Sequence, residues 1–308
     1  MDKPPLCNTG VKRKGWLEMS ELQRSVEVTY DWISATFRDS NAYYIEKLIP
    51  VGQRIDKPKN KPQHGYNAIA VYESGAIIMW HSNREEMGYH ISLSGSALRW
   101  IADKGMNCLS VLSEIKRLGG RTSRIDIAID ASGYEFNPSV LSKSTREPYH
   151  GKGRTPQFTN VGDVEDGWTI YVGSRSSDQF LRIYDKAKEM GIEGENLTRI
   201  ELECKGALAH YVGWELAGKT AHEAYVFAST KIRTMVDFNS SHWKEVMTSE
   251  TVEISLPKKT DRDTMLWLVK SCAPALAKQI AAKPSEDVIG QFWQALRQEL
   301  ALRNIEVE

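Results

Sequence analysis

Three short segments of the chain alternate apolar with ionisable residues, which is the period of a β-strand. They cover residues 124–130, 181–186 and 199–204. Because side chains on a strand point alternately to opposite sides, the segments predict one sheet with two unlike faces. The mostly apolar face carries Ile125, Ile127, Ile129, Leu181, Ile183, Asp185, Ile200, Leu202 and Cys204. The mostly polar face carries Arg124, Asp126, Ala128, Asp130, Arg182, Tyr184, Lys186, Arg199, Glu201 and Glu203.

The same kind of pattern predicts further elements along the chain. It favours strands within 28–37 and 67–80, and helices over 96–104, 109–118, 220–228, 261–282 and 284–304. A short helix after Pro138 and a long loop over 145–167 precede the strand that carries Tyr171. Helices in some stretches and antiparallel strands in others predict an α+β fold, with a central antiparallel sheet in two lobes and helices on one face. The predicted parts are an N-terminal segment 1–27, a main domain 28–240 and a helical C-terminal region 241–308.

Composition places the chain among ordinary globular proteins, with 41% hydrophobic and 26% charged residues. No apolar run approaches the ~18 residues of a membrane span, and the first residues lack the pattern of a signal peptide. The four cysteines lie far apart in the sequence, which predicts neither a disulfide framework nor a zinc site. We therefore expect a cytoplasmic protein.

The overall charge does not favour non-specific coating of nucleic acid, since the formal net charge is +0 and the pI is about 7.1. Local basic patches are the candidates for contact with phosphates. One is the loop 52–65, and another is the stretch 143–154, which includes Lys152 and Arg154. Solvated loops without a ligand have the same composition, so both interpretations stay open.

The polar face of the predicted sheet gathers several carboxylates among arginines and lysines. Oxygen ligands of this type bind hard divalent cations such as Mg²⁺ or Mn²⁺. Asp126 and Glu201 are the first candidates for metal ligands, and Glu203 and Asp130 follow. The alternative is a face of cross-strand ion pairs without a metal, each worth roughly 0.2–1 kcal/mol.

Tyr184 lies on the same predicted face, with Arg182 and Lys186 two residues away on either side. Both cations would favour the tyrosinate, because a free phenol has a pKa near ~10. Arg124 or Arg199 could neutralise a phosphate oxygen. Together these are the parts of an enzyme that transfers a DNA phosphate to tyrosine. Tyr171 is the competing nucleophile, but no pair of cations flanks it.

At these residues the chain resembles the replication initiation factors (the Rep_trans type) of rolling-circle plasmids and filamentous phages. The motifs that carry the resemblance are residues 30–37, 88–95, 123–130, 169–175, 182–186 and 199–203. The resemblance implies a site-specific nickase and strand transferase with a relaxase-like palm, in which the domain 28–240 becomes joined to a 5′ phosphate. Tyr184 matches the family's nucleophile.

The resemblance also implies further roles for named residues. The metal-binding acids map to Asp126 and Glu201, with Glu203 as a further candidate, and the metal would be Mg²⁺ or Mn²⁺. A His-hydrophobe-His motif is absent, which favours a site led by carboxylates. His90, in a strand-like stretch, is an additional candidate ligand whose alternative role is structural. Ser174 and Arg175, in the turn 173–178, would contact phosphate, or simply close a hairpin.

The partners implied are a DNA origin, single-stranded or extruded as a hairpin, a second copy of the chain and a host helicase. Three alternatives remain. One is a relaxase of a mobilisable element with the same chemistry, another is a non-catalytic DNA-binding regulator, and the third is a metal nuclease that uses water.

Overall fold

The structure is a computed structural model of the chain. It describes residues 24–38, 42–55, 61–143, 158–163, 165–255, 261–283 and 287–302. These residues form two compact units, one up to Ile254 and one from Ser255 onward. No described helix is both long enough and apolar enough to cross a membrane.

The first unit is built on a nine-stranded antiparallel sheet within the described residues, in the order β2-β3-β4-β1-β5-β9-β8-β7-β6. The strands are β1 (Ser25–Phe37), β2 (Ala68–Val71), β3 (Ile77–Trp80), β4 (Tyr89–Ser94), β5 (Arg121–Ser132), β6 (Phe158–Asp163), β7 (Gly167–Gly173), β8 (Gln179–Asp185) and β9 (Leu197–Lys205). The three segments that alternate most clearly in the sequence fall on β5, β8 and β9. These strands are neighbours, so the predicted pairing is confirmed.

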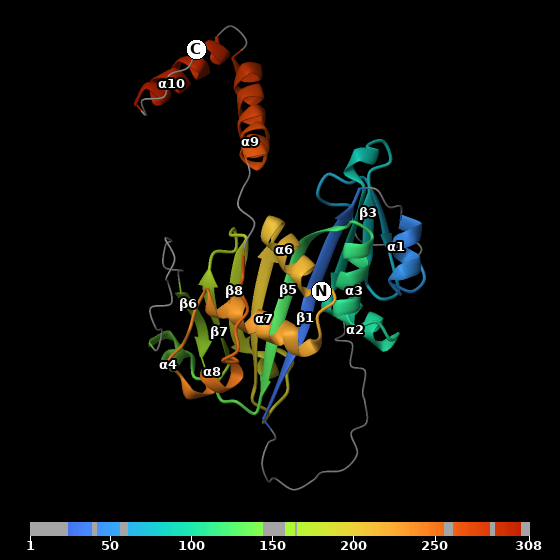
Figure 1. The fold of residues 1–308 in the computed structure, drawn as a ribbon, viewed down its shortest axis with the longest axis vertical. Coiled ribbons are helices and arrows are strands. Elements are labelled where there is room, and N and C mark those ends of the chain that lie inside the picture. Colours follow the sequence, from blue (N-terminus) through green and yellow to red (C-terminus); the bar gives the residue numbers. More distant parts are fainter. Residues whose placement is uncertain are drawn as a thin grey trace, which may run out of the picture. The chain divides into compact units, whose positions relative to one another are not determined.

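Helices cover one face of this sheet. The longer ones are α2 (Gly95–Asp103), α3 (Cys108–Arg117), α6 (Gly206–Leu216) and α7 (Ala221–Arg233), and the shorter ones are α1 (Ala42–Leu48), α4 (Pro138–Lys143), α5 (Lys186–Glu189), α8 (Ser241–Val246) and the 3-10 helix η1 (Glu85–Met87). In Figure 1, α6, α7 and α8 lie in front of the strands. The predicted α+β class, with helices on one face, is therefore confirmed.

The longer helices α2, α3 and α7 begin at residues whose side chains cap them. Ser94 accepts a hydrogen bond from the backbone of α2, Asn107 caps α3, and Thr220 forms a reciprocal capping box with Glu223 at the start of α7. Such caps replace hydrogen bonds that the first turn of a helix cannot make internally.

The core lies between the helices and the apolar face of the sheet. Ile125 and Ile129 of β5, Ile200 of β9 and Ile183 of β8 are fully buried there. Asp185 falls on this face by alternation, but it ends β8 and its side chain accepts a hydrogen bond from the backbone of Lys188, at the start of α5. The two unlike faces predicted from the sequence are thus present.

Two details differ from the sequence-based expectation. Residues 158–163 form the edge strand β6, inside the segment 145–167 that the sequence predicted to be a loop. Apolar and polar residues do not alternate along this segment, so its sequence does not predict a strand. It becomes a strand because its backbone pairs with β7. Lys186 begins α5 instead of continuing β8, because Asp185 caps the helix at that point.

The second unit contains α9 (Asp261–Ala282) and α10 (Val288–Leu302), which contact each other. Ile289, Phe292 and Trp293 of α10 are exposed. The first unit extends beyond residue 240 and includes α8, whose Trp243 is buried in the core of that unit.

Close packing of α6 on β5 generates a prediction about stability. Gly213 of α6 lies over Thr122, and a Cβ atom at position 213 would stand 2.6 Å from the Thr122 Oγ1 atom. We expect Gly213→Ala to lower the free energy of unfolding by about 1–3 kcal/mol, because the helix must move away from the sheet. Urea denaturation measures this change.

The matched control is Glu215→Ala on the same helix, at a half-buried position, for which we expect at most about 0.5 kcal/mol. Equal unfolding midpoints for Gly213→Ala and the unsubstituted protein would contradict the predicted contact.

Candidate active site

The polar face of the sheet holds three clusters of ion pairs, and the most buried cation belongs to Arg199 of β9. Its guanidinium donates two hydrogen bonds to Asp130 of β5, both 2.6 Å long, and a further one to Asp31 of β1. Thr29 also donates to Asp130, at 3.3 Å. Burial by itself would lower the pKa of Arg199, but the two carboxylates outweigh it and raise that pKa. One guanidinium therefore ties three strands together.

The second cluster lies four residues further along β9 and four residues earlier along β5, where Asp126 pairs with Glu203. Arg124 of β5 forms a two-pronged ion pair with Asp126, with distances of 2.9 and 2.7 Å, and reaches Glu203 of β9 at 3.3 Å. Lys205 pairs with the other carboxylate oxygen of Glu203 at 2.6 Å. The Arg124 guanidinium also stands 5.0 Å from the centre of the Trp32 ring. Burial raises the pKa of Asp126, and Arg124 opposes that shift.

The third cluster contains the predicted nucleophile. The Tyr184 hydroxyl donates a hydrogen bond to the Glu201 Oε2 atom at 3.1 Å. Arg182 pairs with the other oxygen of the same carboxylate. Glu201 is only 1% exposed, and the Nε atom of Arg182 is buried without a hydrogen-bond partner among the described residues. A phenol, a buried base and a free N–H donor thus lie side by side.

The protonation of Tyr184 differs from the sequence-based expectation. Burial raises the pKa of Tyr184, Glu201 raises it further, and Arg199 opposes the shift. The charge of Arg182 and that of a Tyr184 oxygen attract each other, but burial and Glu201 outweigh the flanking cations, so the pKa of Tyr184 is raised instead of lowered. Arg182 is paired with Glu201, while Lys186 pairs with Glu189 and stands 5.7 Å from the centre of the Tyr184 ring. Tyr184 is a neutral phenol at neutral pH, so attack requires a group that takes its proton.

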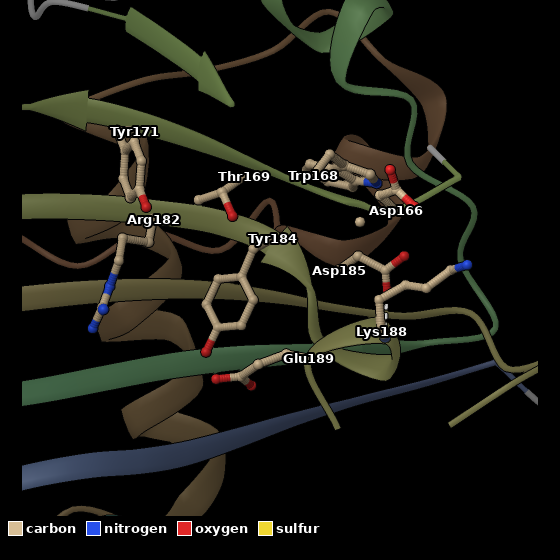
Figure 2. A pocket seen from close by; sticks show the side chains of 10 residues that line it. Asp166, Trp168, Thr169, Tyr171, Arg182, Tyr184, Asp185, Lys188 and Glu189 are labelled. Carbon is tan, nitrogen blue, oxygen red and sulfur yellow. Dashed lines mark hydrogen bonds between the residues drawn. The ribbon is translucent and has the colours of Figure 1, made fainter. Parts of the chain in front are cut away.

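A cavity of about 340 Å³ opens next to Tyr184. Its walls include Trp168, Thr169 and Tyr171 of β7 and Arg182 of β8. Figure 2 shows the side chains of Tyr171, Arg182 and Tyr184 on neighbouring strands, with Glu189 next to the Tyr184 ring. A substrate in this cavity could therefore contact Thr169, Tyr171 and Arg182 as well as Tyr184.

The turn between β7 and β8 carries two of the residues predicted to contact phosphate. The Arg175 guanidinium stands 5.4 Å from the Tyr171 ring centre and 5.5 Å from that of Phe180. Ser174 and Ser176 share a hydrogen bond of 2.8 Å between their hydroxyls. Lys152 and Arg154 lie outside the described residues.

His90 is not brought together with the predicted metal-binding acids. It lies on β4, opposite Thr36 of β1, and Thr36 in turn pairs with Arg121 of β5. Arg121 is five positions along β5 from Asp126, which is roughly 16 Å of strand. The His90 ring is hydrogen-bonded to Thr36 at 2.9 Å and to Ser92 at 3.2 Å. Burial lowers the pKa of His90 to about 4.

The acids that the sequence proposed as metal ligands are Asp126, Glu201, Glu203 and Asp130. All four lie on the polar face, and their oxygen donors are of the type that suits Mg²⁺ or Mn²⁺. Each of them forms an ion pair with an arginine. Among the described residues no group of three or more histidines, cysteines, aspartates or glutamates is arranged to hold a metal ion.

Asp31 is a site residue that periodicity missed. Tyr30 faces Ile127 and Trp32 faces Asp126, so Asp31 is the extra residue of a bulge in β1. A bulge breaks the alternation of side chains. Asp31 can therefore reach Arg199 on the polar face, next to Trp32. Its position within the motif 30–37 was the only signal in the sequence.

Comparison with known proteins finds that the chain is similar to one family of proteins and, among relatives and solved structures, to the following two. The family model of the replication initiation factor matches residues 120–292. A protein of Bacillus subtilis (strain 168), described as "Putative DNA relaxase NicK", is 25% identical over 319 residues, which cover 92% of this chain and 88% of the relative. The solved structure of a rolling circle replication initiator protein from Geobacillus stearothermophilus has a TM-score of 0.57 at 17% identity, and covers 70% of this chain and 88% of the other.

The buried guanidinium generates a prediction about stability. In Arg199→Met, Asp130 and Asp31 would face each other without a cation, so we expect a loss of about 3–5 kcal/mol in the free energy of unfolding. Chemical denaturation at neutral pH measures it. The control is Arg117→Met, whose exposed ion pair with Glu114 should not measurably change the midpoint. A midpoint of Arg199→Met equal to that of the control would refute the role of this cluster.

Proposed function

Because the chain belongs to the replication initiation factor family, we propose that it cuts one strand of DNA at a rolling-circle origin and becomes covalently joined to the cut end. Tyr184 is the proposed nucleophile. The observation that carries the proposal is the hydrogen bond from Tyr184 to Glu201, next to the unpartnered Nε–H of Arg182.

Glu201 is the proposed general base. The Tyr184 hydroxyl already donates to the Glu201 Oε2 atom at 3.1 Å, so proton transfer needs no rearrangement. Burial raises the pKa of the Glu201 carboxyl, which makes its carboxylate a better proton acceptor than an exposed one. A phenol whose pKa is raised benefits most from such a base.

The proposed step is an in-line exchange of ester bonds. The Tyr184 oxygen bonds to the phosphorus as its proton passes to Glu201, and the bond from phosphorus to the 3′ oxygen breaks. The 3′ oxygen leaves and takes up a proton from solvent water to become a hydroxyl, Glu201 returns its proton to solvent, and the 5′ phosphate stays on the tyrosine. One ester replaces another, so attack by a 3′ hydroxyl can reverse the step and rejoin the strand.

Two arginines support the charge on the phosphate. The Arg182 Nε–H is buried and lacks an acceptor among the described residues, and a phosphate oxygen would supply one. Arg199 lies opposite Tyr184 in the strand pairing and lowers the pKa of the phenol, which opposes the effect of burial. Donors that are fixed before the reaction stabilise developing negative charge without reorganisation.

The proposal includes a divalent cation, Mg²⁺ or Mn²⁺, for which Asp126 of β5 and Glu203, its partner on β9, would be the protein ligands. When bound, it would polarise the phosphodiester as a Lewis acid. Arg124 now pairs with both Asp126 and Glu203, so it competes for the same oxygens. If Arg124 is displaced from Asp126 and Glu203 by the cation, the Arg124 guanidinium becomes available to bind a phosphate.

A relaxase role in DNA transfer is the second candidate, favoured by the likeness to "Putative DNA relaxase NicK" over 92% of the chain. It uses the same chemistry on a different origin. A cytoplasmic location, a homodimer and recruitment of a host helicase stay predictions. A regulator without catalysis or a nuclease that uses water are the outcomes that the following experiment separates.

One prediction of this proposal concerns the nucleophile. With labelled single-stranded oligonucleotides from the DNA around the gene, we expect the unsubstituted protein to form a covalent adduct that survives denaturing electrophoresis. Tyr184→Phe should form none, since it lacks the attacking oxygen, whereas Glu201→Gln should reduce the rate at least about 100-fold. The matched control is Tyr171→Phe, on the neighbouring strand, which should keep adduct formation.

Other outcomes would change the assignment. Cleavage without an adduct in all variants would indicate a nuclease that uses water. Binding without cleavage, on a panel that covers the origin, would indicate a regulator. Loss of the adduct in Tyr171→Phe, with retention in Tyr184→Phe, would move the nucleophile to β7.

Another prediction of this proposal concerns the cation. Binding of Mn²⁺ alone is measured by calorimetry, and adduct formation is measured separately. EDTA should abolish the adduct, and Asp126→Asn should weaken Mn²⁺ binding about tenfold or more. Arg124→Gln should strengthen it, because the competing guanidinium is gone. If neither substitution changes Mn²⁺ affinity, Asp126 is not a ligand.

A further inference from the structure

A second cavity, of about 380 Å³, lies along the edge of β1. The first half of β1 pairs only with β5, because β4 joins its other side from Trp32 onward. Consecutive residues from Glu27 to Asp31 line the cavity, as expected for a strand edge rather than a strand face. Helices α2, α3 and α7 supply the opposite wall.

The lining of this cavity has the composition of a binding site. Small and apolar side chains make up most of the helical wall: Leu98, Ala102, Leu109, Ala221 and Ala224. The polar residues of the lining are Glu27, Thr29, Tyr30, Asp31, Arg99, Asn107 and Arg199. A slot with apolar walls and polar groups that can fix orientation is the usual form of a site for a flat organic ligand.

One of the polar groups lacks a partner. The Tyr30 hydroxyl is buried and has no hydrogen bond among the described residues. Buried hydroxyls in folded proteins are normally hydrogen-bonded, so an unpaired one in a cavity wall indicates a group still to be bound. Burial, and then Cys108, raise the pKa of Tyr30, so the hydroxyl is neutral and can donate as well as accept.

A cation stands at the same cavity. Arg99 of α2 is exposed, and no ion pair of its side chain exists within the described part of the chain. Gly95, one turn earlier, leaves room beside it. A Cβ atom there would lie 3.2 Å from the Asp31 Oδ1 atom and 3.6 Å from the Arg99 Nη1 atom. An unpaired guanidinium next to an apolar slot suits a phosphate attached to a planar base.

The cavity also connects to the candidate active site. Asp31 and Arg199 line it, and both belong to the ion-pair cluster with Asp130. Arg199 lies opposite Tyr184 in the pairing of β9 with β8. β1 lies three strand spacings from β8, which is roughly 14 Å. A strand of DNA that presents a phosphate to Tyr184 would therefore have a nucleotide a few positions away within reach of this slot.

We propose that the β1-edge cavity binds one nucleobase of the single-stranded DNA a few nucleotides from the cut phosphate, with Tyr30 hydrogen-bonded to the edge of the base and Arg99 to a phosphate. The inference rests on the proposed function, since it takes DNA as the ligand. It assigns the cavity to recognition of one position of the origin. The chemistry at Tyr184 does not depend on it.

The experiment compares binding by variants that alter the slot, all made in the Tyr184→Phe background so that no DNA is cut. Tyr30→Phe removes only the unpaired hydroxyl. Ala102→Leu fills the slot from an exposed position of α2. The matched control is Ala277→Leu, at an exposed position of α9 in the other unit. Thermal unfolding confirms that each variant is folded.

The probes are single-stranded oligonucleotides around the cut site, or around the bound region if no cut is found, each with one base removed. We expect one abasic position to weaken binding by the Tyr184→Phe protein about tenfold. Ala102→Leu should weaken binding of the intact strand about tenfold, and Tyr30→Phe about fivefold. On the strand abasic at that position both losses should vanish, because the base that they contact is absent.

Three results would overturn the inference: no effect of either slot variant on binding, equal effects on every abasic strand, or effects that Ala277→Leu shares. Adduct formation by the unsubstituted protein on the same strands separates the two proposals. An adduct without coupling between slot and base removes the cavity's role and leaves the nickase. Coupling without an adduct leaves the recognition site and removes the catalytic proposal.

Discussion

Burial of carboxylates on the polar face of the sheet is the constraint on which the rest of the structure depends. Asp126 and Glu201 are 2% and 1% exposed, and a buried charge without a partner costs several kcal/mol. Each carboxylate is therefore matched by an arginine on its own strand or a neighbouring one. Arg199 neutralises two carboxylates at once, Asp31 and Asp130, and its single guanidinium thereby joins β1, β5 and β9.

The same burial governs the chemistry proposed for the site. Burial and the adjacent Glu201 raise the pKa of Tyr184, so the protein holds a neutral phenol hydrogen-bonded to the proposed base instead of a stored tyrosinate. Reactivity then depends on proton transfer at the moment of attack. The arginines that balance the carboxylates also supply donors for phosphate. One polar network thus serves folding and, in our proposal, strand transfer.

Much of this arrangement could be predicted from the sequence. Alternation in β5, β8 and β9 correctly assigned nine of ten residues to one face; the tenth, Lys186, begins a helix. The edge strand β6 was missed because its pairing comes from β7 and not from its own pattern. Asp31 was missed because a bulge in β1 turns it toward Arg199, and bulges leave no trace in periodicity.

The sequence by itself determined which residues share a face, since strand geometry fixes the period at two regardless of context. It also determined the α+β class and the motifs of the family. Only the tertiary structure decided that Glu201 accepts a hydrogen bond from Tyr184, that Arg124 pairs with acids proposed for a metal, and that His90 stands apart from them. Those contacts depend on strand order and register, and the pKa values depend on burial, and neither is local to any segment of the chain.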